Sequence, residues 1–221
     1  MKIIEPKVVI ITEIDGKAIL QKIEEIGRVC YKSEHKISKY SSNDFVAAIV
    51  KRGHESVIEH EIISVKVICD RGVSHEIVRH RLASYSQEST RYCNYSQEKF
   101  GKELTMIKPF FLPGDSGIYK CWERQMVEIE KTYNEMIACG AKPEEARSIL
   151  PCSLKTEIVI TMNLRAWRHF FKLRCAKASH PQLRQITIPL LLELQKRINV
   201  IFDDLDYDRD FDPNYYAEIE G

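Results

Sequence analysis

The alternation of apolar and polar residues between Glu61 and Cys69 constrains the fold most, because only an extended strand places such apolar residues on one face. The apolar positions are Ile63, Val65, Val67 and Cys69. The pattern predicts a strand with one face in a hydrophobic core. Three further segments, rich in β-branched or apolar residues, are also predicted to be strands: 7–14, 104–111 and 157–162.

Helical spacing of apolar residues occupies much of the remaining chain. Helices are expected over Asp15–Arg28, from Ser41 to near Gly53, over Ile118–Cys139, after Pro143, over Leu164–Cys175 and over Pro181–Phe202. Ser74 is expected to cap another helix that continues to about Leu82. Because strands and helices mix without regular βαβ alternation, the predicted class is α+β, with a mixed or antiparallel sheet flanked by helices.

The composition is that of a globular protein: 44% of the 221 residues are hydrophobic and 29% are charged. No internal repeat or low-complexity linker divides the chain. We therefore expect a single catalytic domain over residues 1–221, in which the acidic residues 203–221 form a peripheral tail.

Charge and cysteine usage exclude several classes of protein. The 33 basic residues nearly balance the 32 acidic ones, which argues against a general nucleic-acid binder. Seven cysteines without a CxxC pair predict neither a disulfide framework nor a zinc knuckle, and no metal site is expected. The first apolar run, Val8–Ile11, is too short for a signal peptide, and no window is apolar enough for a membrane span. Free thiols then favour the cytoplasm.

Arginines recur in segments that also carry apolar patterns: Arg79, Arg81, Arg91, Arg147, Arg165, Arg168 and Arg174. A buried guanidinium needs an anionic partner, and its planar fork of donors suits phosphate. Any one of them fits a surface role, but Arg79-His80-Arg81 followed by polar residues up to Arg91 predicts an anion site. On a helix, Arg79 and Arg81 would point roughly 200° apart, so we expect two anionic ligands or one that spans two subunits.

The spacing Arg79-His80-Arg81, seven residues, then Ser89 has the form RHR(x)7S and resembles the motif of the flavin-dependent thymidylate synthases. Flanking segments resemble further blocks of that family, from about Gly53 to Gln182: Gly53-His54-Glu55-Ser56, Glu59-His60, His75-Glu76-Ile77-Val78, Glu145-Ala146-Arg147, Met162-Asn163-Leu164-Arg165, His169 and Leu173-Arg174. Gln87 stands where some members have Glu, and His169 where some have Asn.

The resemblance implies a role for each matching residue. The residues implied to contact FAD are Ser56, Arg79, His80, Arg81, Asn163, Leu164, Arg165 and His169. Those implied to bind dUMP are Glu76, Ile77, Val78, Arg79, Gln87, Glu88, Ser89, Thr90, Arg91 and Arg147. Arg174 is implied to bind dUMP at the uracil ring and to act catalytically by favouring ionisation at N3.

The same resemblance implies the reaction and the assembly. The chain would convert dUMP to dTMP, with 5,10-methylenetetrahydrofolate as one-carbon donor and NADPH reducing the FAD. It would form a homotetramer whose sites are shared between subunits.

The residues alone leave simpler interpretations open. Arg174 suits a helix-end arginine that binds carbonyl groups, and Ser89, lacking an adjacent base in the sequence, suits a nucleotide binder better than a nucleophile. Cys152 is expected to be a buried structural cysteine, and His54 to lie near the flavin. His180 suits a helix cap or a site residue.

Two other functions remain as alternatives. One is a module for single-stranded nucleic acid, with a basic aromatic platform formed by Arg79, Arg81, Arg91, Tyr85, Tyr92 and Tyr95. The other is a nucleotide or flavin sensor without turnover.

Overall fold

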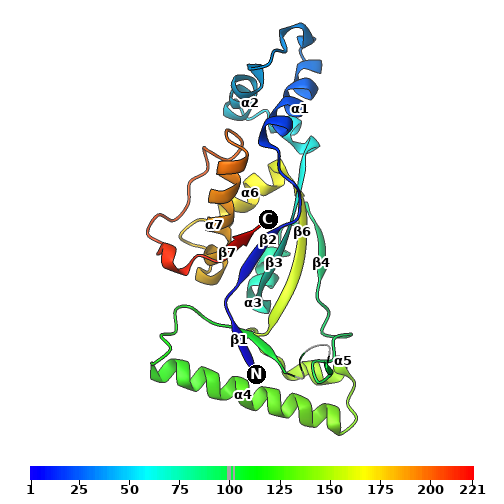
Figure 1. Ribbon diagram of the computed structural model, residues 1–221, viewed down its shortest axis with the longest axis vertical. Coiled ribbons are helices and arrows are strands. Elements are labelled where there is room, and N and C mark those ends of the chain that lie inside the picture. Colours follow the sequence, from blue (N-terminus) through cyan, green and yellow to red (C-terminus); the bar gives the residue numbers. More distant parts are fainter. Residues whose placement is uncertain (99–100, 102) are drawn as a thin grey trace. The chain divides into compact units, whose positions relative to one another are not determined.

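The computed structural model describes residues 1–98, 101 and 103–221 (Figure 1). In the described chain, the helices are α1 (Gly16–Val29), α2 (Ser41–Lys51), α3 (Arg71–Ile77), α4 (Gly117–Ala138), α5 (Pro143–Ala146), α6 (Leu164–Arg174) and α7 (Pro181–Arg197). Short 3-10 helices are η1 (Glu34–Lys36), η2 (Glu55–His60), η4 (Arg147–Ile149) and η5 (Pro213–Tyr215).

The described strands form two sheets. In the smaller one, β1 (Lys2–Ile4) pairs in parallel with β5 (Thr105–Ile107). The larger one has the order β4-β6-β3-β2-β7, and its strands are β2 (Lys7–Ile10), β3 (Ile62–Asp70), β4 (Ser84–Gln87), β6 (Lys155–Asn163) and β7 (Glu218–Glu220). The α+β class predicted from the sequence is confirmed.

The described chain divides into two compact units made of interleaved segments. The first unit comprises residues 1–7, 67–79 and 86–158, and the second comprises residues 8–66, 80–85 and 159–221. Strands β3 and β6 contribute residues to both units. The single catalytic domain over residues 1–221 stays a prediction.

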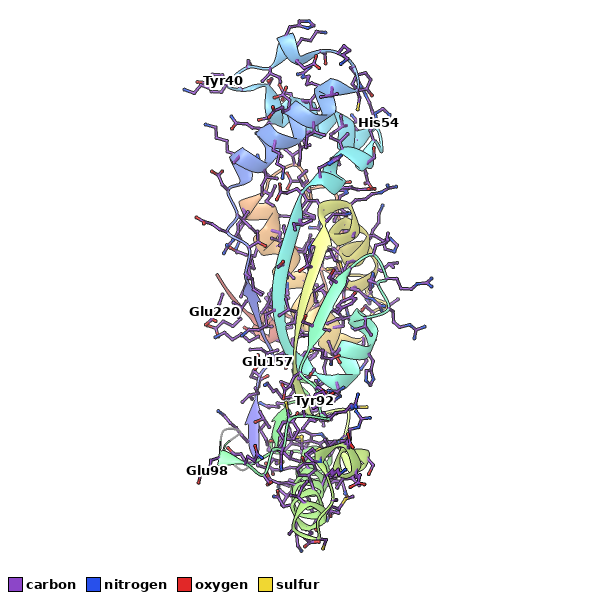
Figure 2. The ribbon with its side chains drawn as sticks, turned by 90° about the vertical axis from the view of Figure 1, so that its right-hand side faces the viewer. Tyr40, His54, Tyr92, Glu98, Glu157 and Glu220 are labelled. Atoms are coloured by element: carbon purple, nitrogen blue, oxygen red, sulfur yellow. The ribbon has the colours of Figure 1, made fainter. Side chains whose placement is uncertain are left out.

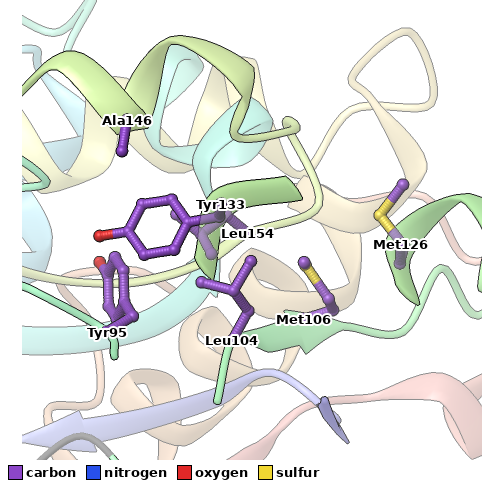
Figure 3. Packing of buried hydrophobic residues seen from close by; sticks show 7 residues of the cluster. All are labelled: Tyr95, Leu104, Met106, Met126, Tyr133, Ala146 and Leu154. Carbon is purple, nitrogen blue, oxygen red and sulfur yellow. The ribbon is translucent and has the colours of Figure 1, made fainter. Parts of the chain in front are cut away.

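The first unit has a hydrophobic core beside α4. Tyr95, Leu104, Met106, Met126, Tyr133, Ala146 and Leu154 form its buried cluster (Figure 3). The rings of Tyr95 and Tyr133 lie with their centroids 6.1 Å apart. Gly140 follows α4 with a φ of +97°, the left-handed conformation that glycine adopts readily, as the predicted end of this helix requires. Pro143 begins α5, also as predicted.

The core of the second unit surrounds one face of α6. Trp167 stacks on Phe171 at 5.4 Å between ring centroids, and Phe202 meets Phe171 edge-on at 5.7 Å. The indole Nε1 of Trp167 donates to the carbonyl oxygen of Ile63 at 3.1 Å. Asn163 caps α6, as predicted, by accepting a hydrogen bond from Ala166 N at 2.8 Å. A rigid packed helix therefore supports the residues on its other face and at its end.

Helix α3 begins and ends earlier than predicted. Its cap is Asp70, whose Oδ1 accepts from Val73 N at 2.7 Å, whereas the Ser74 hydroxyl donates to the carbonyl of Arg71. The extended backbone and the carboxylate of Asp70 start the helix at the end of β3, and the helix ends at Ile77. Arg79 and Arg81 thus follow the helix, and the predicted angle of roughly 200° between them does not apply.

The segment 203–221, expected to be a peripheral tail, contributes several buried side chains to the second unit. Asp208 and Phe211 are buried, and β7 is an edge strand hydrogen-bonded to β2. Asp208 N donates to the carbonyl of Cys175 at 2.8 Å, and Ala217 N donates to that of Gln185 at 2.9 Å. The segment is rich in acidic residues, and some of them pair with basic residues of α6 and α7. These ion pairs and the buried apolar residues of the segment hold it against the rest of the second unit.

Candidate active site

The boundary between the units falls within the arginine-rich stretch, between Arg79 and His80. The residues expected to bind dUMP belong to the first unit, except Arg174. Those expected to contact FAD belong to the second unit, except Arg79. The two sets are therefore built on different local frameworks.

In the second unit, the last residue of α6 meets the histidine of the stretch. Nε of Arg174 donates a hydrogen bond to Nε2 of His80 at 2.9 Å. The His80 ring also lies edge-on to Phe170 and His169, with centroids 4.8 and 5.8 Å away. The hydroxyl of Tyr85 donates to the carbonyl oxygen of His80 at 2.6 Å. Both the ring and the backbone of His80 are held in place.

The protonation states of this cluster follow from burial and charge. Burial, with smaller contributions from the nearby Arg174 and His169, lowers the pKa of His80 to about 4. His80 is therefore neutral at pH 7, and since Nε2 accepts from Arg174, its proton sits on Nδ1. Burial raises the pKa of Tyr85 to about 12 against the opposing effect of Arg174, so Tyr85 remains a phenol.

The other expected FAD contacts fall into two groups. Ser56, Arg81, Arg165 and His169 expose their side chains. By contrast, the Leu164 side chain is fully buried and that of Asn163 caps α6, so these two offer mainly their backbone.

The exposed donors suit a flavin dinucleotide. Arg165 lies 2.6 Å from a carboxylate oxygen of Glu59 and 3.7 Å from one of Glu55, and its side chain is half exposed. Arg81 is exposed as well. Two accessible guanidinium groups match the diphosphate chemically, and the imidazole rings of His80 and His169 add flat surfaces. The residues present thus fit the group.

In the first unit, hydrogen bonds anchor the start of the expected dUMP segment. Nε2 of Gln87 donates to the hydroxyls of Ser74 at 2.9 Å and Thr156 at 3.2 Å. Glu88 accepts from the Tyr95 hydroxyl at 2.8 Å and from Lys155 Nζ at 3.0 Å. These bonds occupy Gln87 and Glu88 with the protein itself.

Two pKa shifts accompany this anchor. Burial and the neighbouring Glu88 raise the pKa of Tyr95 well above its usual range. Burial alone would lower the pKa of Lys155, but hydrogen bonds to Glu157 and Glu88 raise it instead. Lys155 is therefore a cation and Tyr95 a phenol at pH 7.

The end of the segment forms a turn that presents Arg91. The hydroxyl of Ser89 accepts from Arg91 N at 3.3 Å, and Thr90 is buried. The exposed Arg91 side chain lies 4.0 Å from a carboxylate oxygen of Glu144 in α5. Arg147, also exposed, directly follows α5. The structure thus brings Arg91 to the helix that precedes Arg147. The expectation that Ser89 binds the nucleotide, rather than acting as a nucleophile, stays a prediction.

The remaining expected dUMP residues lie around the end of α3. Ile77 is buried in the core, whereas Val78 and Arg79 are exposed and Glu76 is half-buried. Ile77 can therefore meet a ligand only through its backbone.

The structure bears on several expectations about single residues, and one of them, at Cys152, needs correction. Of the seven arginines in the inventory, all within the described residues, only Arg168 is buried and Arg174 half-buried. Cys152 was expected to be buried but is exposed, because it lies in the turn before β6. His180 is a helix cap that accepts from Gln182 N at 3.3 Å. His54 lies at the surface (Figure 2), its Nδ1 3.1 Å from the Tyr31 hydroxyl.

Sequence reasoning gave Arg168 no specific role, although it organises the second unit. Its guanidinium binds both carboxylate oxygens of Asp204, at 2.6 and 2.7 Å, and Glu55 at 3.0 Å. It also donates to the carbonyl of Ile201. The helical stripe of Leu164, Trp167, Arg168 and Phe171 contains the signal that was missed, since it places Arg168 on the apolar face.

The described residues contain no helix both long and apolar enough to cross a membrane. Among them there is also no group of three or more histidine, cysteine or acidic side chains arranged to hold a metal ion.

Comparison with known proteins places the chain. Residues 14–198 match the family model described as thymidylate synthase complementing protein. The chain is 36% identical over 170 residues to the flavin-dependent thymidylate synthase of Pyrococcus furiosus, covering 76% of this chain and 69% of that protein. It is 30% identical over 217 residues to the enzyme of the same name from Mycobacterium sp. strain JLS, covering 88% and 82%.

A solved structure has the same fold. It is the UMP/dUMP methylase PolB of Streptomyces cacaoi bound with 5-Br dUMP, with a TM-score of 0.74 and 20% identity, covering 92% of this chain and 96% of that one. The fold and the sequence matches together define a flavin-dependent enzyme of the methyltransferase class. Within that class, the chain belongs to the flavin-dependent thymidylate synthase family.

Proposed function

We propose that this chain converts dUMP to dTMP by reductive methylation at C5. In balanced form, dUMP, 5,10-methylenetetrahydrofolate, NADPH and a proton give dTMP, tetrahydrofolate and NADP+. The observation that carries the proposal is the pair of Arg174 and His80 at the end of α6, within a chain of this family.

Arg174 activates the pyrimidine in this proposal. A guanidinium beside the uracil ring stabilises negative charge at N3 and so makes C5 a better nucleophile. The neutral ring of His80 orients Arg174 Nε without adding a negative charge that would compete with the substrate.

The first unit holds the nucleotide. The segment from Gln87 to Arg91 is anchored at its start by Ser74 and Thr156, which supports a preformed binding loop. Arg91 and Arg147 are exposed cations whose planar donors suit the phosphate, and Arg91 would exchange Glu144 for it. Glu76 to Arg79 complete the proposed dUMP contacts.

The second unit holds FAD, which when bound supplies the hydride that it receives from NADPH. Ser56, Arg81, Arg165 and His169 would hold it with their exposed side chains, and His80 with its Nδ1–H. Asn163 and Leu164 would contribute through their backbone, and Arg79 through its exposed side chain.

We further propose a cytoplasmic homotetramer with sites shared between subunits. Leu82 beside Arg81 and Tyr92 beside Arg91 are 84% and 75% exposed, so apolar surface accompanies the proposed binding residues and a second subunit would cover it. All seven cysteines are free thiols in the described chain, which supports a reducing compartment.

Turnover by the purified chain tests the proposal. With FAD, dUMP, methylenetetrahydrofolate and NADPH, we expect dTMP by chromatography and tritium release from C5-labelled dUMP. Arg174→Ala should lower turnover by about 100- to 1000-fold, the usual effect of removing a charge-stabilising donor. The affinity for FAD should change little, and Arg174→Lys should restore part of the turnover.

Two outcomes would contradict the proposal. A colourless protein that neither binds added FAD nor releases tritium would exclude the reaction. Equal losses of turnover and FAD affinity in Arg174→Ala would show that Arg174 serves the cofactor rather than the pyrimidine.

A further inference from the structure

We propose that His80 is a positioning residue for Arg174, acting through the hydrogen bond from Arg174 Nε to its Nε2. The resemblance assigned His80 only to the flavin. The inference rests on the proposed function, in which Arg174 activates dUMP.

The hydrogen bond restrains the whole guanidinium group. Nε carries a single hydrogen in the plane of the group, and it is directed at His80 Nε2, which lies 2.9 Å from Nε. Because Cδ, Nε and this hydrogen lie in the plane of the group, directing the hydrogen restrains the plane and hence the direction of the two terminal amino groups. A ligand at those amino groups would meet donors already oriented.

His80 is itself restrained from several sides. Helix α6 supplies Phe170, edge-on at 4.8 Å, and His169 at 5.8 Å. Tyr85 in β4 holds the backbone carbonyl of His80 through its hydroxyl. Support of this kind is what a positioning residue requires, since a mobile acceptor would not orient its donor.

The charge state of His80 agrees with this role. Nε2 accepts only in the neutral ring, and burial together with Arg174 and His169 favours that form. The remaining facing group, Tyr85, is a phenol. The proton then lies on Nδ1, so one imidazole accepts from Arg174 and still offers a donor on its other nitrogen.

Substitution of His80 by Gln or by Asn distinguishes the roles of its two ring nitrogens. The Gln side chain places an oxygen at about the distance of Nε2 from Cβ, so His80→Gln keeps an acceptor for Arg174. The Asn side chain reaches only as far as Nδ1, so His80→Asn keeps a donor there and loses the acceptor. With FAD saturating, we expect His80→Gln to weaken FAD affinity, because it loses the Nδ1 donor, but to lower kcat less than His80→Asn does. His80→Asn should lose tenfold or more in kcat, or about 1.4 kcal/mol, with KM for dUMP little changed.

Coupling to Arg174 distinguishes positioning from general support. In the Arg174→Ala background, His80→Asn should cause no further loss of kcat, because the residue on which it acts is absent. Thermal melting of each variant checks that it folds. Additive losses, or an active His80→Asn beside an inactive His80→Gln, would overturn the inference.

A spectroscopic measurement keeps the inference testable if the chain makes no dTMP. In protein labelled with [15N]arginine, the Arg174 Nε–H resonance, assigned with Arg174→Lys, should be protected from exchange. It should stay so in His80→Gln and lose protection in His80→Asn. Wild-type inactivity alone would reject the proposed function, whereas an unprotected wild-type resonance would reject the role of His80.

Discussion

The middle and the end of α6 use the same residue type in opposite ways. Arg168, in the middle, is 4% exposed and is bound by the carboxylates of Glu55 and Asp204. Arg174, at the end, is half-buried and donates its Nε to the neutral ring of His80. Carboxylates neutralise a guanidinium, whereas a neutral acceptor orients it. The carboxylates balance the charge of Arg168, whereas the contact with His80 directs the Nε–H of Arg174.

Position along the helix explains the difference. Arg168 lies in the apolar stripe with Trp167 and Phe171, where an unpaired charge would be costly. Arg174 ends the helix, beside the exposed Leu173. A cation at a helix C-terminus is also favoured by the helix dipole.

Among the substitutions that test this difference, we expect the largest effect from removing the Arg168 side chain, which should destabilise the folded chain. Arg168→Ala should lower the free energy of unfolding by about 3 kcal/mol, the lower end for a broken buried pair, because Asp204 is over half exposed. Urea unfolding measures it. The matched control is Arg165→Ala, whose half-exposed side chain pairs with Glu59 and should matter little. Equal effects at both positions would remove the distinction between the two kinds of arginine.

A carboxylate at position 80 should give Arg174 a charged partner of the kind that Arg168 has. In His80→Glu, the new charge would attract the Arg174 guanidinium by up to a few kcal/mol at a contact distance. We expect turnover to fall about tenfold or more while the melting temperature holds or rises. Steady-state kinetics beside calorimetry would show this, with His80→Gln as the uncharged control. Undiminished turnover would mean that the neutrality of His80 is irrelevant.

A further expected effect is on the dependence of stability on pH. Unfolded His80 binds a proton below pH 6.5, and folded His80 only below about 4, so in this window the unfolded chain holds more protons. The stabilising contribution of neutral His80 is therefore complete above pH 6.5 and is lost as the pH falls towards 4. As the pH is lowered from 7 to 4, the urea midpoint should fall more steeply for wild type than for His80→Gln.

Asp204 titrates below this pH window. The hydrogen bond from Arg168 lowers the pKa of Asp204 below its ordinary value of 3.8, so its contribution disappears only at lower pH. Identical slopes for wild type and His80→Gln would show that His80 is not held neutral by the fold.

The sequence predicted those elements whose signals are local. Alternation predicted β3, and a run of apolar and β-branched residues predicted β6. Asn163, Gly140 and Pro143 marked element ends correctly, because each has a backbone or capping property that suits a helix end. The start of α3 was missed because Asp70 and Ser74 both suit a cap, and only the direction of β3 decides between them.

Long-range pairing could not be predicted from the sequence. Arg174 and His80 are 94 residues apart, and Arg168 and Glu55 are 113 apart, so no local pattern joins them. The acidic segment after Asp203 was misjudged for the same reason, since its composition did not show that Asp204 and Asp208 pair with Arg168 and Arg184. Family resemblance named the site residues, but the partner of each came from the structure.

The pairing of Arg168 with Asp204 also sets an order of events during synthesis. Glu55 is made long before Arg168, but Asp204 follows it by 36 residues. At about 5–20 residues per second, that interval lasts roughly two to seven seconds. During it, the nascent α6 carries a guanidinium on its apolar face with only one of its two carboxylates available. We therefore expect the helix that ends in Arg174 to reach its final packing only after the segment beyond Asp203 has joined it.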